Sequence, residues 1–267
     1  MTTLVLLHAF PVDSRMWNPV RSVLAAAGRL ADPPAGSPAP GPDALTLVTP
    51  DQRGCGRTPL PGDGAEPHVD VVARDVLAHL DSLGVDRAVV GGCSMGGYVA
   101  MALARIAPER VAGLLLADTR PDADDADRRA MRLAAAERAE REGTDWLPAT
   151  VLPGLLAAGS PDTHPELAAR LRAVITEQPP AGVAWAQRAM AARPDSADVL
   201  RAFDGPALVV VGERDALSPP EQARAMAAML PAGRYVELPG SGHLAPVESP
   251  DEFVAALTTW LRDTHPA

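Results

Sequence analysis

The chain has 267 residues, a hydrophobic fraction of 47% and a formal net charge of -10. This length suffices for one large hydrophobic core, and the surplus of acidic residues argues against binding to nucleic-acid phosphates or to an anionic membrane surface. Two cysteines, Cys55 and Cys93, do not make a disulfide framework, and no apolar run reaches membrane-spanning length. The apolar N-terminus lacks the basic region of a signal peptide, so we expect a cytoplasmic protein.

Strands alternate with helices along the first part of the chain. The elements that its apolar pattern predicts are, in chain order, a strand over 4–7, a helix over 14–27, a strand over 45–48, a helix over 69–83, a strand beginning at 87, a helix that ends at 107 and a strand over 111–117. A stretch rich in proline, alanine and glycine at 31–43 predicts a loop.

A long helical stretch then interrupts this alternation. Residues 119–203 show helical periodicity, and eight prolines divide them into four expected short helices. The alternation resumes with a strand over 207–211, a helix over 220–230, a strand over 235–238 and a helix over 250–262. These patterns predict a mostly parallel sheet of about six strands with helices on both faces. They divide the chain into a core domain, 1–118 with 204–267, and a helical cap, 119–203, over the ligand-binding edge of the sheet.

The segment Gly92-Cys93-Ser94-Met95-Gly96 matches the G-x-S-x-G pattern between a predicted strand and a predicted helix. In this context the glycines allow a sharp turn, which presents the serine hydroxyl at the helix N-terminus. Ser94 is therefore the candidate nucleophile. An idle serine in a glycine-rich turn is the alternative. Cys93 beside it is expected to be a small packing residue.

A serine nucleophile needs a base, and the base needs an orienting acid. Asp215 and His243 each follow a predicted strand, so both are expected at the sheet edge that carries Ser94. We predict His243 as the base and Asp215 as the acid. Glu213 and Asp118 remain alternatives for the acid. The other histidines, which are poorer candidates for the base, are His8, His68, His79, His164 and His265.

Acyl transfer also needs hydrogen-bond donors for the developing oxyanion. The backbone N–H of Met95, which follows the nucleophile, is one candidate. The other is expected in the loop His8-Ala9-Phe10-Pro11. Phe10 has an N–H to donate and Pro11 has none, so we predict that Phe10 and Met95 form the oxyanion hole.

These motifs resemble the α/β-hydrolase superfamily over nearly the whole chain. The resemblance rests on segments 6–11, 51–58, 92–96, 212–215, 240–243 and 248–250. Within the superfamily, the chain looks most like small carboxylesterases and 3-oxoadipate enol-lactonase-like members. It departs from the family pattern at Ala9, where the family has glycine, and in beginning at what would be the family's third strand. Asp51 and Arg53 are expected to brace the loop near the serine.

The resemblance implies two-step hydrolysis of a small ester or lactone through an acyl-enzyme on Ser94, with no metal or organic cofactor. The same three residues also serve C–C bond hydrolysis and cofactor-free perhydrolysis, and a non-catalytic binding protein on this fold is a further alternative. A homodimer is possible. The residues expected to line the substrate pocket are Phe10, Trp17, Met95, Trp146, Leu155, Trp185 and Met190. Four arginines are candidates to pair with a substrate carboxylate: Arg128, Arg129, Arg132 and Arg188. A surface position without such a role is favoured for them.

Overall fold

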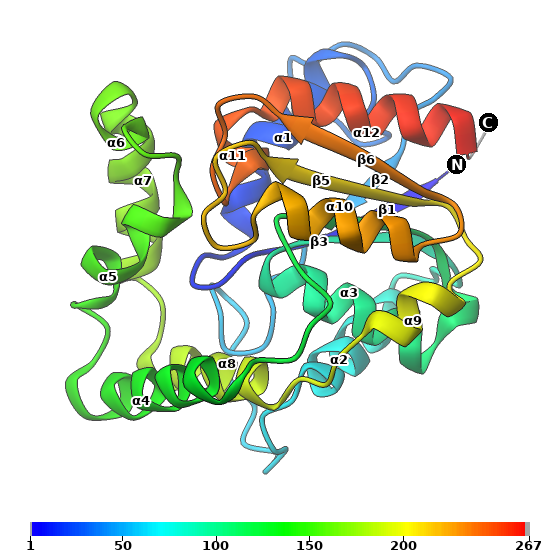
Figure 1. The fold of residues 1–267 in the computed structure, drawn as a ribbon. Helices are drawn as coiled ribbons and strands as arrows, with labels where there is room; N and C mark the ends of the chain where they lie inside the picture. Colours follow the sequence, from blue (N-terminus) through cyan, green and yellow to red (C-terminus); the bar gives the residue numbers. More distant parts are fainter. Residues whose placement is uncertain (1, 265–267) are drawn as a thin grey trace.

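A six-stranded sheet lies at the centre of the part of the chain that the structure describes, residues 2–264 of a computed structural model (Figure 1). Its strands are β1 (Thr3–Leu7), β2 (Thr46–Val48), β3 (Ala88–Cys93), β4 (Val111–Ala117), β5 (Ala207–Gly212) and β6 (Gly233–Leu238). The order across the sheet is β2-β1-β3-β4-β5-β6, and each neighbouring pair is parallel. The predicted parallel sheet is confirmed.

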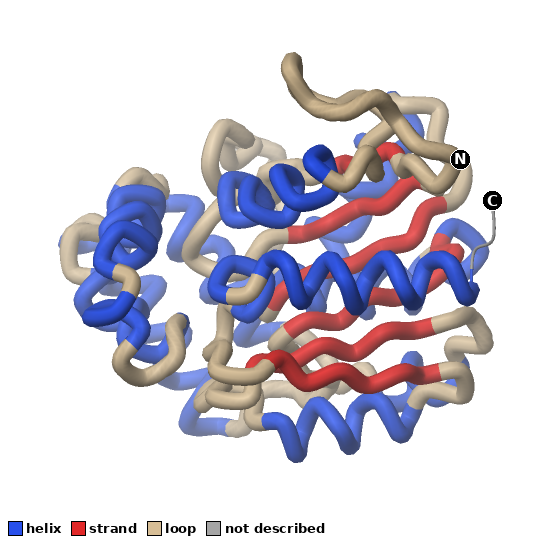
Figure 2. Tube along the Cα trace, turned by 90° about the horizontal axis from the view of Figure 1, so that it is seen from above, coloured by secondary structure: helices blue, strands red, loops and turns tan. Residues whose placement is uncertain are grey.

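Side chains of each strand alternate between two hydrophobic clusters, one on each face of the sheet. In β1, Leu4 and Leu6 belong to one cluster, whereas Val5 and Leu7 belong to the other. Helices cover both faces (Figure 2). The first cluster includes residues of α1 (Asn18–Ala26) and α12 (Pro250–Thr264), and the second includes residues of α2 (Val69–Ser82), α3 (Met95–Ile106) and α10 (Pro220–Met229).

Short helical turns complete the core. The predicted helix over 14–27 begins as a 3-10 turn, η1 (Ser14–Trp17), before α1. A second 3-10 turn, η2 (Pro108–Arg110), precedes β4, and α11 (Ala245–Glu248) follows the loop after β6. Among the described helices, none has the length and apolar character needed to cross a membrane.

Between β4 and β5 the chain forms what we call the helical segment, residues 119–203. It contains α4 (Ala126–Glu142), α5 (Leu147–Leu155), α6 (Ser160–Thr163), α7 (Pro165–Thr176), α8 (Pro180–Ala192) and α9 (Ala197–Ala202). The expectation of four helices was wrong, because four of the eight prolines start helices rather than separate them: α5, α6, α7 and α8 each carry proline in their first turn. The arrowheads of β5 and β6 point toward the side on which α4–α8 lie (Figure 1).

Candidate active site

Ser94 occupies a sharp turn between β3 and α3. Its backbone has φ 52° and ψ -111°, a conformation that few non-glycine residues adopt. A Cβ atom on Gly92 would lie 2.1 Å from the carbonyl carbon of Gly96, and one on Gly96 would lie 2.1 Å from the carbonyl oxygen of Leu7. Packing therefore requires glycine at both positions, and the G-x-S-x-G pattern follows from this turn.

The side chains of Ser94, His243 and Asp215 form a hydrogen-bonded chain. Ser94 Oγ lies 2.8 Å from His243 Nε2, and His243 Nδ1 lies 2.9 Å and 3.0 Å from the two carboxylate oxygens of Asp215. The backbone N–H groups of Leu217 and Ser218 donate to the same carboxylate at 2.8 Å and 2.9 Å. A carboxylate only accepts, so the imidazole proton lies on Nδ1 and Nε2 is left to accept from the serine hydroxyl.

Neither alternative acid is hydrogen-bonded to the His243 ring. Glu213 accepts from the backbone N–H of Gly240 at 2.7 Å. Asp118 is buried at the end of β4, where it accepts from the N–H groups of Gly212 at 2.9 Å and Ala245 at 3.1 Å. Burial and the nearby Asp215 carboxylate raise the pKa of Asp118 well above its usual value. Asp118 therefore ties together the chain segments that carry Asp215 and His243.

Cys93 and the loop at 51–58 have the packing roles expected of them. Cys93 is fully buried, and its Sγ lies 3.7 Å from a carboxylate oxygen of Asp118. Asp51 accepts from the backbone N–H of Ser14 at 2.8 Å, which ties this loop to η1. Arg53 Nε lies 2.7 Å from Asp75 of α2. Within residues 2–264, no three His, Cys, Asp or Glu side chains are grouped as ligands of a metal ion would be.

His8 fixes the loop that follows β1. Its Nδ1 donates to the carbonyl oxygen of Ala9 at 3.0 Å, and its Nε2 accepts from the backbone N–H of Gln52 at 2.9 Å. Complete burial lowers the pKa of His8, so the ring is neutral near pH 7. The Ala9 carbonyl also accepts from the N–H of Val12 at 3.2 Å. Because C=O and N–H point in opposite directions across a trans peptide, these bonds also orient the N–H of Phe10.

Alanine at position 9 is compatible with this loop. Among the described non-glycine residues, only Ser94 and Asp118 have a positive φ, so Ala9 introduces no backbone strain. On the other side of the serine, Met95 is the first residue of α3. An N–H at this position has no acceptor within its own helix, and it is free to bind a ligand.

Ser94 and His243 open into a cavity of about 440 Å³, a volume in the range of small-molecule sites. Residues after β1, β3, β4 and β5 form one side, and α4, α5 and α8 form the other. Phe10, Leu155 and Met190 line it as expected, whereas Met95, which was also expected there, is not among its lining residues. The remaining lining residues are Pro11, Tyr98, Arg120, Arg128, Met131, Arg132, Ala135, Thr150, Val151, Gly154, Gln187, Ala216, Leu217 and Ser218.

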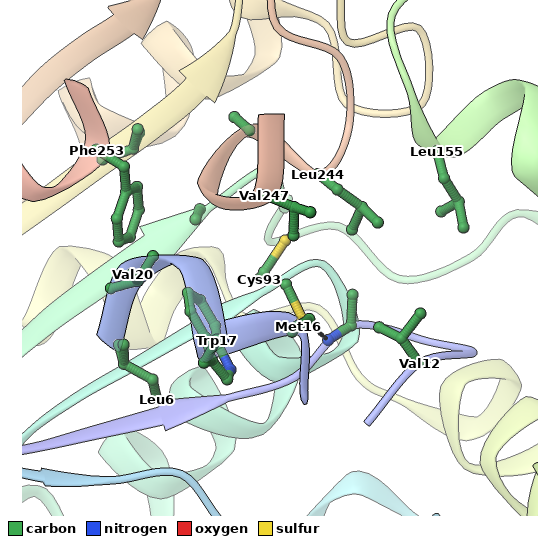
Figure 3. Close-up of a cluster of buried hydrophobic side chains, with 14 of the residues drawn as sticks. Leu6, Val12, Met16, Trp17, Val20, Cys93, Leu155, Leu244, Val247 and Phe253 are labelled. Atoms are coloured by element: carbon green, nitrogen blue, oxygen red, sulfur yellow. Dashed lines mark hydrogen bonds between the residues drawn. The ribbon is translucent and has the colours of Figure 1, made fainter. Parts of the chain in front are cut away.

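The three tryptophans expected in the pocket wall do not line this cavity. Trp17 is fully buried in the core with Leu6, Val20 and Phe253 (Figure 3), and its ring centroid lies 6.0 Å from that of Phe253. The Trp146 indole donates to the carbonyl oxygen of Gly143 at 2.8 Å, and its ring packs under Arg138. Trp185 is buried, with Arg53 5.5 Å from its ring centroid. All three tryptophans pack against protein.

The arginines of the helical segment divide into two groups. Arg128 and Arg132 line the cavity. Arg129 is exposed and lies outside it, and Arg188 pairs with Glu140 at 2.5 Å. Sequence reasoning missed Arg120, which also lines the cavity. Its place just after β4, at the sheet edge that carries Ser94, is the signal that would have found it.

Comparison with known proteins identifies related chains. The model of the alpha/beta hydrolase family matches residues 4–256. A thermophilic esterase from Thermogutta terrifontis, solved with malate bound, is 37% identical and superposes with a TM-score of 0.89 over 99% of this chain and 91% of its own. The enol-lactonase from Burkholderia xenovorans LB400 is 27% identical, with a TM-score of 0.83 over 97% of this chain and 91% of its own.

Curated relatives include longer proteins. The dihydrolipoyllysine-residue acetyltransferase component of the acetoin cleaving system of Pseudomonas putida is 29% identical over 98% of this chain, which spans 64% of that relative's length. The chain spans 46% of the length of another relative, the biotin biosynthesis bifunctional protein of Cellvibrio japonicus. The predicted resemblance to small esterases and enol-lactonases is confirmed. With a family model that matches nearly its whole length, this chain belongs to the alpha/beta hydrolase family.

Proposed function

We propose that this protein is a serine hydrolase that cleaves a small ester or lactone through an acyl-enzyme on Ser94. The observation that carries the proposal is the hydrogen-bonded chain from Ser94 through His243 to Asp215, which opens into a cavity of about 440 Å³. Similarity to an esterase and an enol-lactonase supports the same reaction class.

The first step forms the acyl-enzyme. His243 Nε2 accepts the proton of the Ser94 hydroxyl as Oγ bonds to the carbonyl carbon, which gives a tetrahedral intermediate. The intermediate collapses, the C–O bond to the alcohol breaks, and His243 returns the proton to the leaving oxygen. In a lactone the alcohol stays attached to the acyl group. Asp215 stabilises the imidazolium that forms and keeps the ring in its productive tautomer.

The second step repeats this chemistry with water. His243 takes a proton from a water molecule, whose oxygen bonds to the acyl carbon. The bond between that carbon and Ser94 Oγ then breaks, and the proton on His243 passes to Oγ. The acid leaves, and the enzyme returns to its starting state. No redox change occurs in either step.

The developing oxyanion needs two donors, and we assign them to the backbone N–H groups of Phe10 and Met95. The hydrogen bonds to the Ala9 carbonyl from His8 and Val12 support the orientation of the first. The position of Met95 at the start of α3 supports the second, because the helix N-terminus favours negative charge.

The helical segment is assigned as a cap, residues 119–203, over a core of 1–118 and 204–267. Side chains from α4, α5 and α8 on one side of the cavity support this division. A cap in this position shields the serine from bulk solvent and sets which esters enter.

The test is covalent labelling with a fluorophosphonate, combined with hydrolysis of p-nitrophenyl acetate. We expect labelling at Ser94, and we expect Ser94→Ala to lower kcat by roughly 10⁴-fold or more. A folded protein that takes no label and hydrolyses no activated ester would be a binding protein rather than an enzyme. Full activity in Ser94→Ala would overturn the nucleophile. Faster cleavage of β-diketones, or peroxide-dependent oxidation, would assign the triad to C–C hydrolysis or perhydrolysis instead.

A further inference from the structure

Arg120 is a buried cation without an anionic partner. Its side chain lines the cavity that holds Ser94 and His243, and the residue is only 7% exposed. Two of its guanidinium nitrogens, Nε and Nη1, are buried and donate to no acceptor among the described residues. Arginine stays protonated in proteins, and a buried charge is costly unless it is paired. The structure therefore leaves the positive charge of Arg120, beside the cavity, without an anion from the described part of the chain.

Two other arginines of the helical segment, Arg132 and Arg193, differ from Arg120 in this respect. Arg193 and Arg132 share the carboxylate of Asp124, at 2.8 Å and 2.5 Å. Arg193 also donates to the carbonyl oxygens of Met190 and Asp122. These two side chains hold the helical segment together. Arg120 has no such task in the described part of the chain.

The position of Arg120 is fixed by its neighbours along the chain. Thr119 Oγ1 donates to the carbonyl oxygen of Ser94 at 2.8 Å, which ties the preceding residue to the nucleophile itself. The carbonyl oxygen of Pro121 accepts from the N–H of Ser196 at 2.9 Å. Because β4 lies between β3 and β5, this short segment leaves the sheet between the strand of Ser94 and the strand that leads to Asp215. These contacts fix the segment that carries Arg120 next to the turn that carries Ser94.

The charge of the cavity lining also favours an anionic ligand. Three arginines, Arg120, Arg128 and Arg132, line the cavity, and no aspartate or glutamate is among its described lining residues. Arg132 is paired with Asp124, so Arg120 and Arg128 are the lining cations without a carboxylate partner among the described residues, in a chain whose net charge is -10. A site of this kind attracts a small anion. It discriminates against neutral analogues of that anion mainly by charge rather than by shape.

We infer that the substrate carries a carboxylate besides its scissile ester or lactone, and that Arg120 binds this carboxylate. The planar guanidinium matches a carboxylate through two parallel N–H···O bonds. The inference rests on the proposed function, because it names the substrate class of that site. It makes Arg120 a specificity-determining residue. The free carboxylate of a small acid ester lies against Arg120, while the carbonyl carbon of the ester reaches Ser94.

The test compares monoethyl esters of succinate, glutarate and adipate with the matching primary amides, in which a neutral amide replaces the free carboxylate. For the best chain length we expect wild-type kcat/KM to favour the carboxylate by about 10- to 100-fold. In Arg120→Met the ratio should fall to near one, mainly through KM, and Arg120→Lys should recover part of it. Arg129→Met, a loss of the same charge at an exposed position outside the cavity, should keep the wild-type ratio.

Three results would overturn the inference: a wild type that shows no preference at any chain length, an Arg120→Met variant that keeps the preference, or inorganic phosphate that inhibits more strongly than glutarate. Calorimetric titration of Ser94→Ala with the same esters separates this inference from the proposed function. Carboxylate-dependent binding that Arg120→Met abolishes would support the anchor even if no hydrolysis occurred. Equal binding of acid and amide would overturn the anchor even in an active esterase.

Discussion

At the scale of single residues, the position of Ser94 depends on the absence of a side chain at Gly96. Gly96 stands where any side chain would meet the backbone of β1, because its Cβ would lie 2.1 Å from the Leu7 carbonyl oxygen. The contact atom belongs to a central strand and has no room to yield. A methyl group at this position would move α3 away from the sheet, and Ser94 with it.

We therefore predict that Gly96→Ala destabilises the fold by about 2 kcal/mol or more and lowers esterase activity sharply, as overpacking of a dense core does. Gly62→Ala is the matched control. Gly62 is exposed with nothing within 4 Å of its Cβ position, so its change should stay within about 0.5 kcal/mol. Urea unfolding measures both variants. Equal stabilities would show that α3 adjusts more easily than its packing indicates.

His8 is the second residue whose role follows from burial. The folded protein keeps its ring neutral because burial lowers the pKa of His8 below the ordinary value of 6.5. In the unfolded chain this histidine takes up a proton below about pH 6.5. The unfolded state then binds more protons than the folded state, and the free energy of unfolding must fall as the pH falls.

The prediction is a loss of stability below pH 6.5 with a slope that approaches about 1.4 kcal/mol per pH unit from this one group. His8→Asn removes the titrating ring but keeps a donor for the Ala9 carbonyl. The difference in unfolding free energy between wild type and His8→Asn, measured in urea from pH 8 to pH 5, isolates His8 from other histidines. A difference that does not change with pH would contradict a neutral buried ring.

At the scale of elements, the sheet was the easier part to predict from the sequence. Its strands are short apolar runs, and parallel strands carry Ser94, Asp215 and His243 to one edge by topology alone. The pocket was harder. Its walls come from helices whose facing sides depend on long-range packing, so Trp17 was placed in the pocket although it lies in the core. Arg120 was overlooked because only its lack of a partner in three dimensions distinguishes it.

The Asp124 carboxylate connects the beginning of α4 to the end of α8. Asp124 precedes α4, Arg132 lies in α4 and Arg193 follows α8. Burial opposes ionisation of Asp124, but the hydrogen bond from Arg193 and the charges of both arginines outweigh it, so the pKa of Asp124 lies below its usual value. The guanidinium of Arg193 also stacks 4.1 Å from the ring centroid of Tyr98 on α3. This cluster joins the helical segment to the core.

Asp124→Asn should therefore cost about 3 kcal/mol near pH 7, since it leaves two largely buried arginines without their anion. A lowered carboxyl pKa stabilises the fold above the unfolded value of about 3.8, and this contribution disappears as the pH falls below it. The gap between wild type and variant in chemical unfolding should thus close on acidification. Glu142→Gln, which breaks an exposed pair with Arg138, should cost less than about 1 kcal/mol. Equal costs would contradict the role of burial.

At the scale of the whole molecule, the loop that carries His243 and the helical segment are connected through Glu248 on α11. Its carboxylate accepts from the N–H of Gly242, the residue before His243, at 2.7 Å. The same carboxylate accepts from the Ala157 N–H at 3.0 Å and from the Ser160 hydroxyl at 2.6 Å, both between α5 and α7. The Glu248 side chain thus holds the loop that carries His243 and the segment that contains Ala157 and Ser160 in one arrangement.

The catalytic geometry should therefore respond to the loss of this side chain, although Glu248 does not line the cavity that holds Ser94. We predict that Glu248→Ala lowers kcat for p-nitrophenyl acetate by about 10-fold, because small displacements of a catalytic group are costly to the rate. Ser160→Ala removes only the hydroxyl contact and leaves Gly242 bonded, so its kcat should remain close to wild type. Both rates are measured well below the unfolding temperature of each variant. If the two variants lost kcat equally, the effect would come from the helical segment, and Glu248 would not position His243.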